Sequence, residues 1–311
     1  MKDVTEIEEL LMDLIKIPSV FGHEKDVAEF VIQKLEGFEI EKQFVAENRF
    51  NIIATKGNSK KWLVAHMDTV PGEVPLQLTE DAIFGRGACD NKQSVAGSII
   101  IGNKLKDINL LFTVGEEGYF EGAIAAQKSG IGGDLVVVQE PTNFELITGQ
   151  RGIIDFTIQT KGISKHSSFD NLDSAIHKIL DILAFLREKK WTAFNVGIIE
   201  GGTAGNISAG NAEVIISVRP KSIEEYNDII AALKNIEAKV DIENCYEPHI
   251  SNLKIPLNIG SRGFTEMYFF DNSIVFGAGD ISFAHADNEH ILRKDLNQLP
   301  EKLMEVLNLK I

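Results

Sequence analysis

The chain has 311 residues, of which 44% are hydrophobic and 25% are charged, a composition that suits a globular protein with a substantial core. Its 31 basic and 46 acidic residues give a net charge of −15 without a basic stripe, so we expect no nucleic-acid partner. No apolar run approaches the roughly 20 residues that cross a bilayer, and the N-terminus lacks the apolar core of a signal peptide. Two cysteines are too few for a disulfide framework. Together, these features lead us to expect a cytoplasmic protein without a membrane partner.

The first half of the chain alternates between helical and strand-like patterns. Apolar residues at helical spacing predict helices over residues 6–16, 24–35, 93–105 and 121–129. Short apolar runs predict buried strands at residues 51–54, 62–65, 110–114 and 135–138. Because strands alternate with helices, the fold class is α/β, with a mainly parallel twisted sheet and helices on both faces.

The pattern changes after about residue 150. Strands are predicted at residues 153–161, 194–200, 214–218 and 238–242, and helices at residues 173–189 and 223–236. This order is that of the split βαβ, or ferredoxin-like, α+β arrangement. We therefore expect one domain made of residues 1–150 and 252–311, which closes with a strand at 273–276 and a helix at 295–307, and a second domain inserted over residues 151–251.

The first candidate for chemistry is a His-x-Asp segment at the end of a predicted strand. The strand ends at His66, and Asp68 follows two residues later. Residues two apart face the same side of a strand, and a metal-binding imidazole usually has its other nitrogen held by a carboxylate or a carbonyl. A surface loop in which a histidine and an aspartate happen to meet explains the pattern equally well.

The second candidate is Asp90, in the segment Gly85–Lys92. It stands just before a predicted helix, where it could cap the helix, but a short carboxylate on a constrained loop can also bridge two cations. Cys89 beside it could be a soft metal ligand, although a small buried filler is the more common role.

Three more carboxylates follow predicted strands. Glu116 and Glu117 come after the strand at 110–114, and Glu140 comes after the strand at 135–138. Adjacent acids are common at solvated loop tips, but a metal would also compensate them, with one as ligand and the other as general base. Ligands bind beyond the carboxyl ends of strands in open α/β sheets, so we expect these residues to gather with His66 at one edge. A second histidine, His285, follows later in the chain.

These motifs together resemble the co-catalytic zinc peptidases and deacylases. That family includes acetylornithine deacetylase, succinyl-diaminopimelate desuccinylase, glutamate carboxypeptidase and tripeptidase. The matching segments occur in the family's order over nearly the whole chain, and they are His66–Pro71, Gly85–Lys92, Glu116-Glu117, Glu140-Pro141 and His285.

The resemblance implies two zinc ions, although cobalt or manganese suits the same ligand set. It implies that Asp90 bridges the two ions and that the peptide bond after Asp90 is cis. His66 and Glu140 would complete one metal site, and Glu117 and His285 the other.

The resemblance also implies roles for five further residues. Asp68 would support the first histidine ligand, and Glu116 would be the general base. In the inserted domain, His166 resembles the family's oxyanion-stabilising histidine, which reaches the active site of the partner subunit. The inserted domain would therefore be a lid that joins a homodimer. Asn206, in a glycine-rich loop, and Arg219 resemble substrate-binding residues, the latter for a substrate carboxylate.

The substrate expectation rests on smaller segments. Residues 71–75, 279–280 and 285–290 look most like the small acetyl-lysine and acetylornithine deacetylases of lysine and arginine biosynthesis, whereas residues 93–94 and 261–266 depart from their pattern. The resemblance favours deacetylation of an N-acyl amino acid. The alternative within the family is a di- or tripeptidase or a carboxypeptidase that acts on a short peptide. A non-catalytic metal-binding relative is expected to have lost Glu116 or a ligand, and all of them are present.

Overall fold

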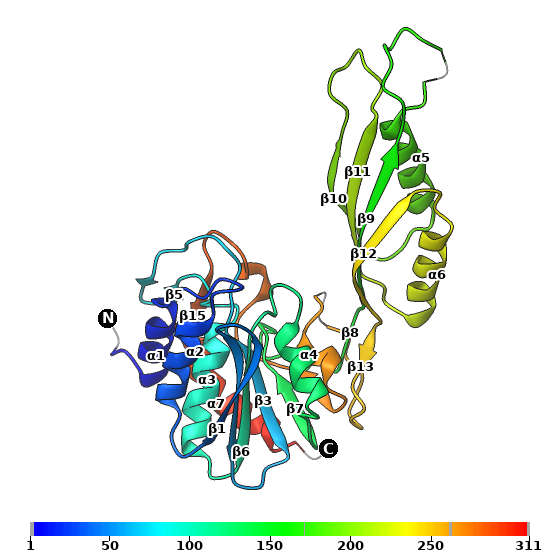
Figure 1. The fold of residues 1–311 in the computed structure, drawn as a ribbon. Coiled ribbons are helices and arrows are strands. Elements are labelled where there is room, and N and C mark those ends of the chain that lie inside the picture. Colours follow the sequence, from blue (N-terminus) through cyan, green and yellow to red (C-terminus); the bar gives the residue numbers. More distant parts are fainter. Residues whose placement is uncertain (1–2, 171, 261–262, 310–311) are drawn as a thin grey trace. The chain divides into compact units, whose positions relative to one another are not determined.

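The computed structural model describes residues 3–170, 172–260 and 263–309. These residues form two compact units, and Figure 1 labels many of their helices and strands. The first unit contains the described residues within 1–149, 250–261 and 265–311, and the second contains those within 150–249 and 262–264. Within the described ranges, no helix is long and apolar enough to cross a membrane.

The first unit is built on a six-stranded sheet of order β1-β2-β6-β3-β7-β14. β6, β3, β7 and β14 run parallel to one another, whereas β2 is antiparallel to both β1 and β6. All six residues of β6 are buried, as expected for a strand covered on both faces. The strands are β1 (Glu39–Ala46), β2 (Arg49–Lys56), β3 (Lys61–His66), β6 (Ile108–Thr113), β7 (Leu135–Val138) and β14 (Ser273–Val275).

Helices cover both faces of this sheet. α1, α2, α3 and α7 bury apolar residues in one core, and α4 and the 3₁₀ helix η1 lie over the opposite face (Figure 1). Leu110 and Phe112 of β6 belong to the first core, and Leu111 between them points to the other face. The predicted fold class is thus confirmed. The helices are α1 (Glu6–Ile15), α2 (Lys25–Lys34), α3 (Lys92–Lys104), α4 (Glu121–Lys128), η1 (Glu266–Phe269), η2 (Ile281–Phe283) and α7 (Arg293–Leu307).

Some strands of the first unit are not predicted by the sequence. β1 is an edge strand whose residues are mostly exposed, so it contains no apolar run to reveal it. Three short strands form a separate sheet of order β15-β5-β4, and they are too short to show a period. Their bounds are β4 (Gln77–Leu78), β5 (Ala82–Phe84) and β15 (His290–Leu292).

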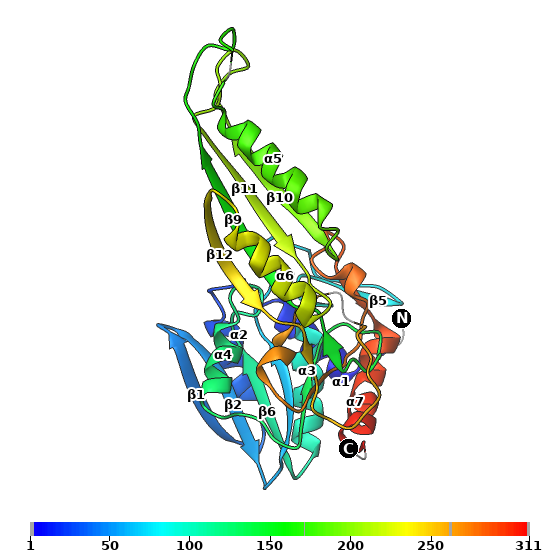
Figure 2. The same ribbon diagram turned by 90° about the vertical axis from the view of Figure 1, so that its right-hand side faces the viewer.

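The second unit has the predicted ferredoxin-like arrangement. Its four strands form an antiparallel sheet of order β10-β11-β9-β12, and α5 and α6 lie together on one face of it (Figure 2). Ala175, Ile179 and Leu186 of α5 pack into the core of this unit. The elements are β9 (Ile153–Lys161), α5 (Ala175–Glu188), β10 (Phe194–Gly201), β11 (Asn211–Val218), α6 (Ile223–Lys234) and β12 (Lys239–Tyr246), with the paired strands β8 (Gly149–Gln150) and β13 (His249–Ile250) where the chain enters and leaves.

Removing the Phe112 ring should lower the free energy of unfolding of the first unit. Phe112 is fully buried in β6, so we expect Phe112→Ala to lose about 3–5 kcal/mol, because it leaves a cavity. Phe44→Ala is the control, since Phe44 is 64% exposed. Urea unfolding measures both variants, and equal losses would contradict the described burial.

Candidate metal centre

The polar residues of the candidate site lie where parallel strands end. β3 ends at His66, which stands in register with Thr113, the last residue of β6. Glu116 and Glu117 follow β6, and Glu140 follows β7 two residues after its end. Because β3, β6 and β7 are parallel, their carboxyl ends share one edge of the sheet.

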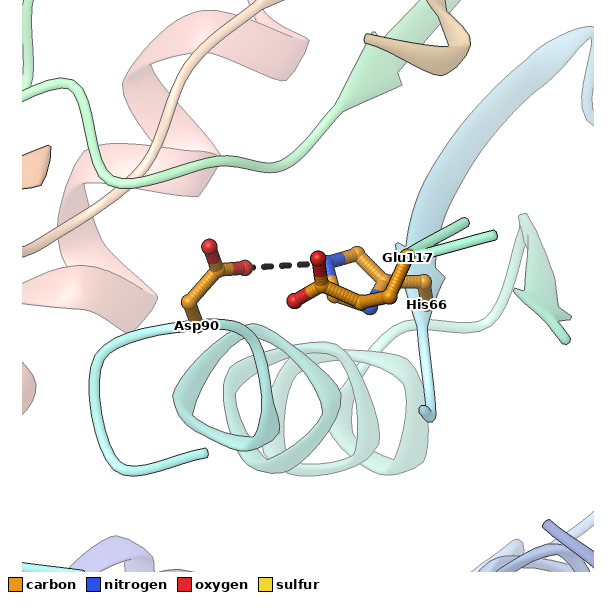
Figure 3. Close-up of side chains that lie close together, drawn as sticks. All are labelled: His66, Asp90 and Glu117. Carbon is orange, nitrogen blue, oxygen red and sulfur yellow. Dashed lines mark hydrogen bonds and ion pairs between the residues drawn. The ribbon is translucent and has the colours of Figure 1, made fainter. Parts of the chain in front are cut away.

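Asp90 lies between two histidines at this edge. Its Oδ1 is 2.9 Å from Nε2 of His66, and its Oδ2 is 3.4 Å from Nε2 of His285. Oε1 of Glu117 is 2.9 Å from the same nitrogen of His285. Figure 3 shows Asp90, His66 and Glu117 close together, and they offer ligand atoms within 4.8 Å of one another. Each oxygen of Asp90 therefore faces a different imidazole, as in a carboxylate that bridges two cations.

Glu140 completes the group beside His66. Its Oε1 is 4.0 Å from Nε2 of His66. Glu140 is only 8% exposed, and this oxygen has no hydrogen-bond partner among the described residues. A buried carboxylate oxygen without a donor is unfavourable, so a cation is a fitting partner. Imidazole nitrogens and carboxylate oxygens suit zinc, cobalt or manganese, and the donor set therefore fits a divalent metal.

Asp68 is fully buried and joins two segments of the site. Its carboxylate accepts the backbone N–H groups of Glu116 at 3.2 Å and Glu117 at 2.9 Å. Nδ1 of His66 lies 3.0 Å from the backbone carbonyl of Asp68 and 3.6 Å from its Oδ1. With Nδ1 donating to that carbonyl, Nε2 of His66 faces Asp90.

Burial and mutual repulsion shape the carboxylates. Burial raises the pKa of Glu116 and of Glu140 well above the usual range; nearby carboxylates raise both further, and His66 opposes the shift. Burial also raises the pKa of Glu117, although its hydrogen bond with His285 lowers the pKa in part. These carboxylates are therefore hard to ionise together unless positive charge lies among them.

In the metal-free chain, the pKa values of the two histidines are shifted toward the protonated, positively charged form. Burial opposes protonation of His66, but its contacts with Asp68 and Asp90 outweigh burial and raise its pKa well above the usual range. Contacts with Asp90 and Glu117 raise the pKa of His285 to about 10. For Asp90, burial disfavours the charge, but hydrogen bonds with both histidines lower its pKa. Divalent metals would take the place of these protons.

Asp90 is not the helix cap that its position allows. Asn91 is the N-cap residue of α3, and its side chain makes no capping hydrogen bond. The peptide bond between Asp90 and Asn91 is cis, which confirms what the resemblance implies. Sγ of buried Cys89 lies 3.4 Å from the carbonyl of Asp280, which agrees with the filler role of this cysteine.

The sequence pattern does not single out two buried glutamates beside this centre. Glu266 in η1 accepts a hydrogen bond from Oγ1 of Thr113, while its Oε1 is buried without a hydrogen-bond partner among the described residues. It belongs to segment 261–266, of which Ser261 and Arg262 lie outside the described residues. Glu289 accepts the backbone N–H of Asp90 at 3.0 Å; it lies in segment 285–290, where no sequence pattern assigns this residue a role.

The three expected residues of the second unit lie at two ends of its sheet. His166 forms a β-bridge with Ile207, and the N–H of Ser167 donates to the carbonyl of Asn206 at 2.9 Å, so His166 and Asn206 are neighbours. Arg219 lies beyond the other end of β11, whose eight residues extend about 27 Å. Nη1 of Arg219 is buried without a hydrogen-bond partner among the described residues. The structure does not bring Arg219 together with the other two.

Comparison with known proteins decides the family. Residues 148–245 match the model of the peptidase dimerisation domain of M20 peptidases. An M20 peptidase domain-containing protein of Schizosaccharomyces pombe is 31% identical over 89% of this chain and 78% of its own length. This chain belongs to the M20 peptidase family. A protein of Aspergillus clavatus with the name "probable carboxypeptidase" is 32% identical over 67% of this chain and 60% of its own length. Another with this name, of Aspergillus flavus, is 31% identical over 92% of this chain and 85% of its own length.

Solved structures have a similar fold over nearly the whole of this chain. A tripeptidase from Staphylococcus aureus superposes with a TM-score of 0.86 at 20% identity, over 98% of this chain and 97% of its own. A dinuclear metal binding peptidase of the M20 family from Bacillus subtilis has a TM-score of 0.67 at 14% identity, over 96% of both chains. At these identities the likeness shows the fold alone.

Glu266 should make the metal-free chain less stable as the pH rises. Burial, with help from the charge of Asp68, raises its pKa to about 7, against the lowering effects of His66 and Thr113. Between about pH 4.5 and 7 the folded chain keeps a proton that the unfolded chain releases, so stability falls with pH. We expect Glu266→Gln to be more stable than the wild type at pH 8, by up to about 3 kcal/mol, and equal to it near pH 4.

Urea unfolding of metal-free protein at several pH values measures this difference. Glu73→Gln is the control, because Glu73 is exposed. A stability difference between wild type and Glu266→Gln that does not change with pH would contradict the raised pKa of Glu266.

Proposed function

We propose that this chain is a two-metal peptidase that hydrolyses an amide bond in short peptides. The observation that carries the proposal is the position of Asp90 between His66 and His285, with Glu117 and Glu140 beside them. The names of similar proteins, which include a probable carboxypeptidase among the relatives and a tripeptidase among the solved structures, favour peptides as substrates. Deacetylation of an N-acyl amino acid is the second candidate, favoured by the resemblance of residues 71–75 and 285–290 to small deacetylases.

Asp90 would bridge the two metals in this proposal. His66 and Glu140 would hold one ion, and Glu117 and His285 the other. Zinc is the metal that we propose, and cobalt or manganese fits the same donors. Two such cations lower the pKa of a water molecule and polarise a substrate carbonyl.

Glu116 is the proposed general base. It directly precedes the proposed ligand Glu117 after the end of β6, and burial raises its pKa well above the usual range, as suits a general base. Its backbone N–H is held by Asp68, which limits the movement of the loop. Glu116 would accept a proton from the attacking water and deliver it to the leaving amine.

His166, Asn206 and Arg219 are the proposed substrate contacts of the second unit. His166 would stabilise the oxyanion, and the guanidinium of Arg219 would bind a substrate carboxylate. Because the length of β11 separates Arg219 from the other two, one end of this unit cannot supply all three to the same site. This separation supports a homodimer in which His166 and Asn206 enter the partner's site.

The second unit offers a surface for such a homodimer. β10 lies at an edge of the described sheet, and an edge strand presents unpaired N–H and C=O groups that another strand can extend. Ile198 and Ile199 of β10 are 48% and 51% exposed, and Leu180 and Phe185 of α5 are 52% and 42% exposed. We propose that a second copy covers these side chains, which agrees with the match to the dimerisation domain.

A substrate panel tests the proposed activity. Metal-loaded protein is assayed with dipeptides, tripeptides, acetylornithine, acetyl-lysine and succinyl-diaminopimelate. We expect the highest kcat/KM for an unblocked di- or tripeptide. Hydrolysis of the acylated amino acids alone would overturn the peptidase proposal in favour of the second candidate.

Glu116→Gln should separate metal binding from turnover. The variant keeps the side-chain size but cannot accept the proton, so we expect kcat to fall by at least about 10²–10⁴-fold while two metals remain by elemental analysis. Glu47→Gln, at an exposed position outside every proposed site segment, should retain wild-type values. Loss of both metals from Glu116→Gln would contradict its assignment as the base.

Mixing two inactive variants tests whether His166 acts across the dimer. Homodimers of His166→Ala and of Glu116→Gln should each be nearly inactive. After subunit exchange, a mixed dimer has one site with an intact Glu116 and the partner's intact His166, so activity should return to about a quarter of the wild-type level. Mixed dimers detected by mass, but without activity, would contradict the transfer of His166 between subunits.

A further inference from the structure

Glu289 has a buried side chain that links the loop of Asp90 to the loop of His285. Its side chain is almost fully buried. Oε1 accepts two consecutive backbone N–H groups, from Cys89 and from Asp90, each at 3.0 Å. Two successive amides that converge on one oxygen form a compact anion-binding nest. The backbone just before the Asp90 side chain is therefore folded around the Glu289 carboxylate.

Arg86 fixes the other oxygen of Glu289. Its Nη1 donates to Oε2 at 2.7 Å, and its Nε donates to the carbonyl of Gly72 at 2.9 Å. The guanidinium thus holds the carboxylate from the side opposite the nest. Arg86 belongs to the segment Gly85–Lys92, which also carries Asp90, and the proposed hydrolysis assigns it no role.

The main chain around Glu289 reinforces this link. The N–H of Gly85 donates to the Glu289 carbonyl at 3.1 Å. The next residue, His290, begins β15 and stands opposite Phe84 of β5. His285 lies four residues before Glu289 on the same segment. One carboxylate therefore joins the loop that carries Asp90 to the loop that carries His285.

We infer that Glu289, with Arg86 as its support, is a positioning residue that sets where Asp90 stands relative to His285. The inference rests on the proposed function, because it concerns two ligands of the proposed metal centre. Asp90 can serve both metals only if its Oδ2 stays near Nε2 of His285, at 3.4 Å here. If the nest is released, the Asp90 backbone can shift, and the geometry of the ligand pair is lost.

A purely structural role is the competing explanation, and a second buried pair provides the control. Glu8 is also fully buried, and it accepts hydrogen bonds from Nε and Nη2 of Arg293 at 2.8 and 2.9 Å. None of the five candidate ligands contacts Glu8 in a hydrogen bond or ion pair that the described residues form. Glu8→Ala should therefore lower stability without changing metal binding.

The test is cobalt binding to metal-free protein, measured by calorimetry and by the visible absorption spectrum of the bound cobalt. We expect Glu289→Ala to weaken the more weakly bound cobalt by roughly 10–100-fold and to change the spectrum. Glu289→Gln keeps a carbonyl oxygen for the nest, so it should lie between the wild type and Glu289→Ala. It also carries the test if the alanine variant does not fold. Glu8→Ala should keep the wild-type affinities and spectrum.

The outcomes separate this inference from the proposed function. A wild type that binds two cobalt ions, with folded Glu289 variants that bind them equally well, overturns the positioning role alone. Equal changes of cobalt affinity and spectrum in Glu8→Ala and Glu289→Ala also overturn it, because the change in cobalt binding would then come from lower stability alone. A wild type that binds fewer than two cobalt ions overturns both the two-metal proposal and the role of Glu289.

Discussion

The crowding of carboxylates at one buried edge of the sheet is the constraint on which the rest of the centre depends. Asp90, Glu116, Glu117 and Glu140 lie close enough to shift one another's pKa values. Negative charges in a poorly solvated place repel strongly. In the metal-free chain the raised pKa values of Glu116, Glu117 and Glu140 favour protonation of the carboxylates, and the raised pKa values of His66 and His285 favour positive imidazoles beside them. Divalent metals would supply the positive charge in the proposed enzyme.

The surroundings of the carboxylates show how the fold meets this constraint. Asp68 holds the backbone of the Glu116 and Glu117 loop through two N–H groups. Glu289 holds the backbone of the Asp90 loop in the same manner. In each case a buried acid that is not a proposed metal ligand fixes the main chain of a residue that is a proposed ligand. Backbone hydrogen bonds to a charged acceptor are strong enough for this task.

The length of the sheet in the second unit determines how far apart its candidate substrate-binding residues lie. A four-stranded sheet covered by α5 and α6 keeps Arg219 apart from His166 and Asn206. In the proposed homodimer, this separation would let one unit supply residues to two different sites. The exposed side chains of β10 and α5 give that exchange a surface on which a second copy could be held.

Sequence alone was sufficient where a local pattern carries the information. Buried runs such as Leu135–Val138 predict the parallel sheet, because parallel strands are covered on both faces. The local patterns around His66 and Asp90 left alternatives open, and the set from His66 to His285 followed only from the resemblance of the ordered motifs to a family. The exposed strand β1 has no such run, and it was missed. Whether Asp90 caps a helix or faces two histidines was decided only by the tertiary structure, as were the places of the two unassigned glutamates. Glu266 meets Thr113 across 153 residues of chain, and Glu289 meets Cys89 across 200. Contacts over such separations leave no periodicity in the sequence, because they form only when the folded sheet brings its strand ends together.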